Sequence, residues 1–447
     1  MTTILTKLPA YRNARLAEHW PDDKRDWRDR GEVGTNIGRV PPKGPSVPKF
    51  PLILFSHGMG GTRTCYSSLC GEFASHGFIV CAIEHRDGSG PRSTVNLPPE
   101  GSVRRRESQA AVAAHHHTKP ETQRSYETVD FLFAQSDKFD TSPDHEIDRE
   151  LREAQVNLRV AEVDEAYYLM TEICAGRGET LKQHNLRRPG ARGASSLGLD
   201  GVDFDTWADR LHCDHVTMVG HSFGSTTTVE MLRNSKKYNY ISQGIIYDIW
   251  GTPVQKGTSE HHITVPLLGI NSEAFMYWED NFNIAKSVIE EAREAGQPVW
   301  LTTCRGTVHI SQSDFCILYP RIANHVLKMT MDPVRAIDVN IDVSLDFLSR
   351  TLHFDEEDGE GEAVFRRNLP SKNYLDLDLI PGVPSEHKPK KKWTAVRLKI
   401  DHEARKRMVP HAREKYWQKQ QALGREEIWV HMAPGRQAVA QEETSRL

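Results

Sequence analysis

The sequence lacks the features that mark several large classes of protein. Its 447 residues contain no apolar run that approaches the roughly 18 residues of a membrane-spanning helix. The formal net charge at pH 7 is only −4, so bulk electrostatics gives no attraction to nucleic acid. The nucleotide-binding patterns G-x-x-x-x-G-K-[ST] and G-x-G-x-x-G with a suitably placed acid are both missing. We therefore expect a chain that spans no membrane and binds no nucleic acid.

Cysteine is sparse and shows no ligand or disulfide pattern. The seven cysteines are an odd number, are scattered and include no C-x-x-C pair, which argues against a disulfide framework and a thiolate zinc site. The run His115–His117 has no spaced partner, and adjacent side chains diverge, so we expect no zinc site there. The sequence therefore predicts no metal and no cofactor.

Targeting signals are also missing. Residues 1–10 include no apolar segment of signal-peptide length, residue 2 is Thr, which excludes myristoylation, and no prenylation cysteine stands at the C-terminus. We therefore expect a cytoplasmic protein. The basic run Lys388–Lys399, which contains Trp393, is either a solvated charged face or a site of peripheral contact with an anionic membrane.

What the sequence does contain is a G-x-S-x-G pentapeptide, Gly220–Gly224. A short apolar run, Val216–Val219, precedes its serine, and a helical pattern begins at Thr226. A strand, a tight turn and a helix are the context of a nucleophile elbow, which exposes the serine hydroxyl and aims the next N–H at the developing oxyanion. We therefore predict Ser222 as a nucleophile and the Phe223 N–H as an oxyanion donor.

A serine nucleophile needs a base, and the base needs an acid that orients it. In hydrolases with this elbow the chain order is Ser, then Asp or Glu, then His. Gly244–Tyr247 is typical of a buried strand and leads into Asp248, while Pro298–Thr303 predicts another strand whose following loop ends in His309. Taken singly, Asp248 could equally be a turn or helix-cap residue, and His309 could equally be a surface histidine. Their order predicts Asp248 as the acid and His309 as the base.

A fourth element lies upstream of the elbow. The apolar run Phe50–Phe55 predicts a strand that leads into the glycine-rich loop Ser56–Thr62. A His-Gly loop after an early strand supplies the second oxyanion donor in α/β hydrolases. We therefore predict the Met59 N–H as the partner of the Phe223 N–H.

Several blocks of the sequence resemble the platelet-activating factor acetylhydrolases, which are serine phospholipases that need no calcium. The resemblance covers roughly residues 45–353 and rests on Phe55–Thr64, Phe73–Val80, Glu84–Ser89, Leu158–Val163, Gly220–Gly224, Pro266–Glu273 and Arg305–His309. It implies an α/β-hydrolase fold, with a mostly parallel central sheet and helices on both faces. It also implies a Ser222–Asp248–His309 triad and an oxyanion hole built by the Met59 and Phe223 backbones.

The resemblance further implies a reaction: hydrolysis of the short or oxidised sn-2 acyl ester of glycerophospholipids, with a phospholipid as substrate. Two departures from the family pattern affect this expectation. Ser225 stands where the family usually has a second glycine, which predicts crowding of the helix packing. A basic, His-rich insert between Ser89 and Glu127 predicts a different pocket rim.

Composition divides the chain into three parts. Residues 1–48 predict an N-terminal arm, residues 49–353 the catalytic α/β-hydrolase domain, and residues 354–447 a charged C-terminal extension that is partly helical or disordered. Within the catalytic domain, insert loops are expected at about 99–120 and 176–201. The aromatic cluster Phe275–Trp278 is either core or the lining of a substrate pocket.

Two other functions stay open at this point. A general carboxylesterase or lipase would use the same triad, and a catalytically silent binding protein would share the fold while its triad was broken. The sequence leaves the oligomeric state undetermined.

Overall fold

The computed structural model describes residues 14–17, 48–98, 126–133, 148–186, 198–353, 369, 373–400 and 427–435. Nearly all of the predicted arm 1–48 and the whole predicted insert 99–120 lie outside these residues. The division of the chain at residues 48 and 353 therefore stays a prediction.

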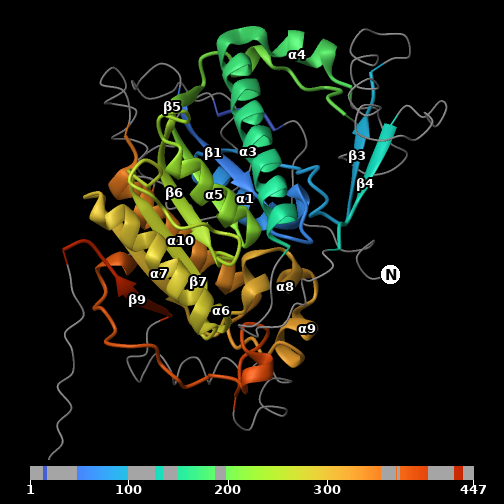
Figure 1. Cartoon of the computed structure of the whole chain (residues 1–447). Coiled ribbons are helices and arrows are strands. Elements are labelled where there is room, and N and C mark those ends of the chain that lie inside the picture. Colours follow the sequence, from blue (N-terminus) through green and yellow to red (C-terminus); the bar gives the residue numbers. More distant parts are fainter. Residues whose placement is uncertain are drawn as a thin grey trace, which may run out of the picture.

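A central sheet organises the described residues (Figure 1). Its order is β2 (Ile79–Ile83), β1 (Phe50–Ser56), β5 (Leu211–His221), β6 (Ile241–Tyr247), β7 (Leu267–Ser272), β8 (Val299–Cys304) and β9 (Ile428–Met432). All neighbouring pairs are parallel except β8 with β9. Every residue of β1, β7 and β8 is buried, as expected for parallel strands that are covered on both faces.

Helices cover both faces of this sheet. In Figure 1, α3 (Arg149–Glu172), α5 (Phe223–Arg233) and α7 (Glu279–Glu294) lie in front of it, and α10 (Pro333–Thr351) lies behind it and contacts α1 (Ser67–Ser75). Asp148 and Asp332 cap α3 and α10 by accepting backbone N–H bonds, which stabilises these helix starts. The prediction of an α/β fold with a mostly parallel sheet and helices on both faces is confirmed.

Regular structure occurs next to one of the two expected insert loops and inside the other. The residues before the predicted insert at 99–120 form β3 (Arg92–Asn96), which pairs with β4 (Tyr126–Asp130) away from the central sheet (Figure 1). The predicted insert loop 176–201 begins with the helix α4 (Gly178–His184). The Gly, Arg and Ser content that predicted a loop there is concentrated in residues 187–197, outside the described residues, whereas Leu181 in α4 packs against the core.

The C-terminal extension contributes a strand that the sequence analysis missed. β9 pairs with β8 in antiparallel register, with Ile428 and Val430 buried. The preceding segment 373–400 contains two short 3-10 helices, Tyr374–Asp376 and Lys391–Trp393. The extension, expected to be partly helical or disordered, therefore includes an edge strand of the central sheet. Five residues with alternating burial are enough to pair with β8, although the surrounding sequence is charged.

The expected crowding at Ser225 is also wrong. Its side chain is fully buried, and its Oγ donates to the Gly220 carbonyl at 2.7 Å and lies 2.9 Å from the Tyr247 carbonyl. Carbonyl groups at the end of β5 and β6 thus accept the hydroxyl, and a glycine is not required at this position.

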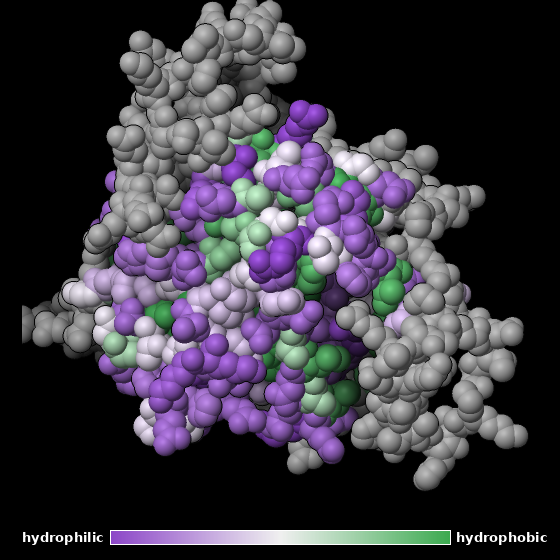
Figure 2. All heavy atoms as spheres, turned by 90° about the horizontal axis from the view of Figure 1, so that it is seen from above, coloured by the Kyte–Doolittle hydropathy of each residue, from purple (hydrophilic) through white to green (hydrophobic). Residues whose placement is uncertain are grey.

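The described surface is largely hydrophilic on the face seen in Figure 2, with hydrophobic side chains in scattered spots. Within the described residues, no helix has both the length and the apolar composition that crossing a bilayer requires.

The neighbours Gly224 and Ser225 give a matched test of the elbow. A Cβ on Gly224 would lie 2.0 Å from the Ser56 carbonyl oxygen, so Gly224→Ala must displace backbone and should lower the free energy of unfolding by about 3 kcal/mol or more. Ser225→Ala removes only hydrogen bonds and should lower it by about 1 kcal/mol. Urea unfolding measures both. A Gly224→Ala variant as stable as the wild type would contradict the close approach of β1 and α5.

Candidate active site

The predicted catalytic residues come together where parallel strands end. Ser222 follows β5, Asp248 follows β6 and His309 lies in the loop after β8. Carboxyl ends of neighbouring parallel strands meet at one edge of the sheet, where α/β proteins bind their ligands. Three residues separated by up to 87 positions therefore share one edge.

Ser222 occupies a strained turn. Its φ is 57° and its ψ is −117°, a conformation that L-residues rarely adopt. The turn is held from both sides, because the Ser222 N–H donates to the Tyr247 carbonyl at 2.9 Å and the Ser222 carbonyl accepts from the Trp250 N–H at 3.2 Å. The strand, turn and helix predicted around this serine are all present.

The three side chains form one hydrogen-bonded series. His309 Nε2 lies 3.0 Å from Ser222 Oγ, and His309 Nδ1 lies 3.0 Å from Asp248 Oδ2. Nδ1 must donate to the carboxylate, which leaves Nε2 free to accept the serine proton. Asp248 is fully buried, and the Ser272 N–H and hydroxyl donate to its two oxygens at 2.5 and 2.6 Å. The geometry is that of a nucleophile, a base and an orienting acid.

The aromatic cluster Phe275–Trp278 was expected either in the core or at a substrate pocket, and Phe275 lies beside the predicted base. Its ring stacks on the His309 imidazole, with the centroids 4.0 Å apart and the planes 7° apart. Met276 and Tyr277 are buried in the core cluster. One member of the cluster therefore limits the movement of the imidazole, while its neighbours pack in the core.

The two predicted oxyanion donors belong to segments that adjoin Ser222. The Phe223 N–H opens α5, and the first N–H groups of a helix have no partner inside it and carry the positive end of its dipole. Met59 is half-buried in the loop after β1. The preceding Gly58 is so close to the serine that a Cβ there would lie 2.9 Å from Ser222 Cβ.

A buried tyrosine and histidine, which the sequence analysis missed, link this loop to His309. The Gly58 N–H donates to Tyr66 Oη at 3.1 Å, and the Tyr66 hydroxyl lies 2.8 Å from His221 Nδ1. His221 Nε2 lies 3.0 Å from the His309 carbonyl. Because a carbonyl only accepts, Nε2 carries the proton and Nδ1 accepts from the tyrosine. Burial lowers the pKa of His221 well below its usual value, which agrees with this neutral form.

A buried arginine connects the segments that carry the two predicted oxyanion donors. Arg159 on α3 is fully buried and donates to Asp87 at 2.6 Å and to the His57 carbonyl at 2.7 Å. Its guanidinium also lies 4.6 Å from the centroid of the Phe223 ring. One cation therefore contacts the backbone two residues before Met59 and the side chain of Phe223.

The charges in this buried cluster are balanced. Burial lowers the pKa of Arg159, and the neighbouring Asp87 opposes that effect. Burial alone would raise the pKa of Asp87, but the Arg159 charge and the hydrogen bonds from Ser89 lower it overall. Burial also holds the pKa of His57 and His85 well below the usual value, so both are neutral at pH 7.

The residues His221, Asp248 and His309 lie close enough together to hold a metal ion. Both nitrogens of each of these histidines already face a hydrogen-bond partner. A metal would have to displace one of these bonds, so the donor set fits the hydrogen-bonded series better than a metal centre.

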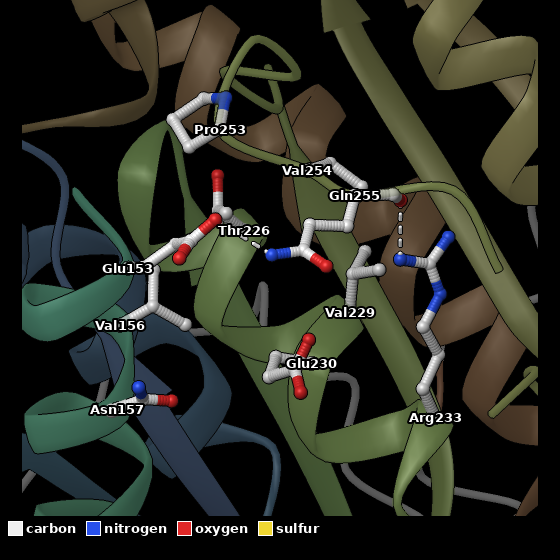
Figure 3. Close-up of a pocket in the computed structure, with 10 residues that line it drawn as sticks. All are labelled: Glu153, Val156, Asn157, Thr226, Val229, Glu230, Arg233, Pro253, Val254 and Gln255. Atoms are coloured by element: carbon white, nitrogen blue, oxygen red, sulfur yellow. Dashed lines mark hydrogen bonds between the residues drawn. The ribbon is translucent and has the colours of Figure 1, made fainter. Parts of the chain in front are cut away.

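A pocket of about 120 Å³ lies between α3, α5 and the loop at 253–255 (Figure 3). Gln255 Nε2 donates to Glu153 Oε1 across it at 2.8 Å, and Arg233 donates to the Gln255 carbonyl at 2.7 Å. Its lining includes none of the three predicted catalytic residues, so we do not assign the substrate to it.

Comparison with known proteins gives consistent matches. The family model described as platelet-activating factor acetylhydrolase, isoform II, matches residues 39–368. The chain is 29% identical over 340 residues to the platelet-activating factor acetylhydrolase of Gallus gallus, covering 74% of this chain and 69% of that protein. It is 30% identical over 331 residues to the Canis lupus familiaris protein of the same name (73% and 63%) and 28% identical over 336 residues to that of Bos taurus (75% and 63%).

A mostly parallel sheet with a strained serine turn at its carboxyl edge is the architecture of the α/β hydrolases, and this chain has that fold. More closely, the chain belongs to the platelet-activating factor acetylhydrolase family, because the family model matches well over half of its length. The name of the family describes hydrolysis of an ester bond, which places the chain among the hydrolases.

Arg159 can be tested against a second buried arginine. Arg159→Met leaves Asp87 without its counter-charge and should lower the free energy of unfolding by about 3–5 kcal/mol. It should also lower kcat, because the Arg159 guanidinium contacts both the His57 carbonyl and the Phe223 ring. The control is Arg233→Met, because Arg233 pairs with Glu291 at 2.6 Å far along α5 and should affect stability alone. Urea unfolding and esterase kinetics measure the two effects; equal kcat values for the two variants would contradict the role of Arg159.

Proposed function

We propose that this chain is a calcium-independent serine esterase that hydrolyses the short or oxidised sn-2 acyl ester of glycerophospholipids. The observation that carries the proposal is the pair of 3.0 Å contacts that His309 makes with Ser222 and Asp248. Family membership supports the substrate class, since the relatives bear the name of a phospholipid acetyl-ester hydrolase.

In the first step, the sn-2 carbonyl oxygen faces the Met59 and Phe223 N–H groups. His309 Nε2 accepts the Ser222 proton while Oγ attacks the carbonyl carbon, and the Asp248 carboxylate stabilises the imidazolium. The two N–H groups bind the oxyanion, and each is worth about 3 kcal/mol of transition-state stabilisation. The lysophospholipid leaves with the proton from His309, so an acyl-serine remains.

In the second step, water replaces the serine hydroxyl in the same arrangement. His309 accepts a proton from the water as its oxygen attacks the acyl-serine carbonyl. Collapse of the second tetrahedral intermediate returns that proton to Ser222 and releases the carboxylic acid. Phe275, stacked on the imidazole, keeps the ring in one orientation through both steps.

A substrate series separates this function from the alternatives. Phosphatidylcholines with sn-2 chains from acetyl to palmitoyl, and a simple ester such as p-nitrophenyl acetate, are compared by kcat/KM. We expect short sn-2 chains to be preferred, and Ser222→Ala to abolish turnover of every substrate and labelling by a fluorophosphonate. A flat profile that favours plain esters would indicate a general carboxylesterase or lipase. Wild-type protein without activity or labelling would indicate a silent binding protein.

We also propose that the protein acts in the cytoplasm and contacts membranes peripherally through the turn Lys390–Arg397. Trp393 is 38% exposed, and the charged ends of Lys392 and Arg397 lie 5.3 and 4.8 Å from its ring. Val396 is 43% exposed beside it. An aromatic ring between cations suits the boundary between headgroups and acyl chains.

This turn lies next to the segment that follows His309. The Leu398 N–H donates to the Leu327 carbonyl at 3.0 Å, just after α9 (Pro320–His325). There Ile322 is 41% exposed and Val326 56% exposed. Apolar and basic groups near the same edge as the proposed site support contact with an anionic lipid surface.

Sedimentation with vesicles tests the membrane contact. Lys391→Glu with Lys392→Glu should weaken binding to vesicles that contain phosphatidylserine by a factor of at least thirty, since each lysine near such a surface contributes about 1 kcal/mol. Turnover of p-nitrophenyl acetate should not change. The control is Lys236→Glu with Lys237→Glu, which makes the same charge change before β6, at the opposite edge of the sheet. Equal weakening by both pairs would refute a specific basic surface.

A further inference from the structure

A histidine outside the matched family region is linked through Glu273 to the loop that carries His309. His387 belongs to segment 373–400, whereas the family match ends at residue 368. Its Nδ1 lies 2.8 Å from Glu273 Oε1, and its backbone N–H donates to Tyr277 Oη at 3.1 Å. Its side chain is only 8% exposed. The C-terminal segment is therefore anchored in the core at this point.

The Glu273 carboxylate is fully buried and joins three elements. Oε1 accepts from the Tyr277 hydroxyl at 2.8 Å as well as from His387, and Oε2 accepts from the Gly306 N–H at 2.6 Å. A buried carboxylate needs donors on both oxygens and an opposite charge nearby. Here Tyr277, Gly306 and His387, from three parts of the chain, supply the hydrogen bonds.

Glu273 in turn sets the position of the proposed base. Gly306 lies three residues before His309, and Thr307 between them accepts from the Glu273 N–H through Oγ1 at 3.3 Å. Glu273 also begins α6 (Glu273–Met276), the helix whose Phe275 stacks on the imidazole. A shift of this carboxylate would move both the backbone before His309 and the ring beside it.

The charges around His387 favour its cationic form. Burial alone would lower the pKa of His387, and Arg305, after β8, also lowers it. The hydrogen bond and charge of Glu273, together with the charge of Glu386, outweigh these effects, so the pKa is raised. With Tyr277 as a neutral donor to the same carboxylate, His387 is the group that supplies a proton-dependent positive charge.

We propose that His387 is a positioning residue for His309 and acts through Glu273. The C-terminal segment is then part of the catalytic unit, and loss of the contact between His387 and Glu273 displaces the base without a direct effect on substrate binding. This inference rests on the proposed function, because it assigns a role only if His309 activates Ser222.

Two substitutions of His387 separate the hydrogen bond from the rest of the side chain. Asparagine places an N–H donor near the position of Nδ1, whereas leucine fills the space without a donor. His387→Leu should lower kcat for p-nitrophenyl acetate by ten- to a hundred-fold with little change in KM, since a displacement of about 1 Å in a catalytic group costs up to that much. His387→Asn should recover most of the loss.

A second substitution tests whether the effect passes through His309. His387→Leu should slow fluorophosphonate labelling of Ser222 in the wild-type background. In a His309→Ala background the same substitution should change neither residual labelling nor residual turnover, because the group that it positions is gone. An equal fold-loss in both backgrounds would overturn the proposal.

His431 provides the matched structural control. It is another buried histidine of the C-terminal extension, and its Nε2 lies 2.8 Å from Thr303 Oγ1 on β8. Thermal unfolding should show lower stability for both His431→Leu and His387→Leu, with kcat retained only in the first. Similar kcat losses in both variants would mean that the extension acts through general stability, contrary to the proposal.

The pH dependence of stability has a definite sign. Because the folded pKa of His387 is raised, its contribution is fully present below the ordinary value of about 6.5 and is lost as pH rises through the raised pKa. The difference in unfolding free energy between wild type and His387→Asn should therefore shrink with rising pH. A difference that does not vary with pH would show that the Glu273–His387 contact carries no charge.

Failure of this inference is distinguishable from failure of the proposed function. Wild-type protein that hydrolyses p-nitrophenyl acetate and reacts with the fluorophosphonate, together with an unaffected His387→Leu variant, would overturn only the inference. Wild-type protein that does neither would overturn both.

Discussion

The four consecutive residues Ser272–Phe275, at the end of β7, contact each part of the Asp248–His309 arrangement. Ser272 donates to both carboxylate oxygens of Asp248, Glu273 accepts from Gly306 before His309, and Phe275 stacks on the imidazole. Because Ser272 also accepts from the Phe275 N–H, the four residues form one capped turn. Backbone geometry therefore fixes the acid, the loop and the ring relative to one another, and none of them can shift alone.

The proposed nucleophile, Ser222, is held by a different kind of constraint. A serine with a φ of 57° carries conformational strain of about 1–3 kcal/mol, which its surroundings must offset. Hydrogen bonds from both sides of the turn do this, and Gly58 packs closely against the serine. The Arg159–Asp87 pair then fixes the loop after β1 against α3. Buried polar contacts thus hold the proposed nucleophile, whereas the turn Ser272–Phe275 contacts the proposed acid and base.

The parts of the site that sequence analysis predicted are those that depend on local pattern and chain order. A G-x-S-x-G between an apolar run and a helical pattern locates Ser222, and the fixed order of strands locates Asp248 and His309. Tyr66 and His221 are 155 residues apart, and Glu273 and His387 are 114 residues apart, so no local spacing relates them. Strand β9 was missed for a related reason: its five residues lie in a charged region, and only pairing with β8 gives them a buried face.

The position of β9 brings the extension close to the loop that carries the proposed base. Without β9, β8 would form the edge of the described sheet, with a row of backbone groups unpaired. β9 pairs along β8 as far as Cys304, and the Arg305 N–H donates to the Glu427 carbonyl at 2.9 Å. The next residue is Gly306, whose N–H donates to the Glu273 carboxylate. The extension therefore approaches the His309 loop at two points, by backbone pairing up to Arg305 and by the His387 side chain, which acts through Glu273. In this chain, part of the support for the proposed base comes from residues beyond the family match, and the catalytic unit is longer than that match.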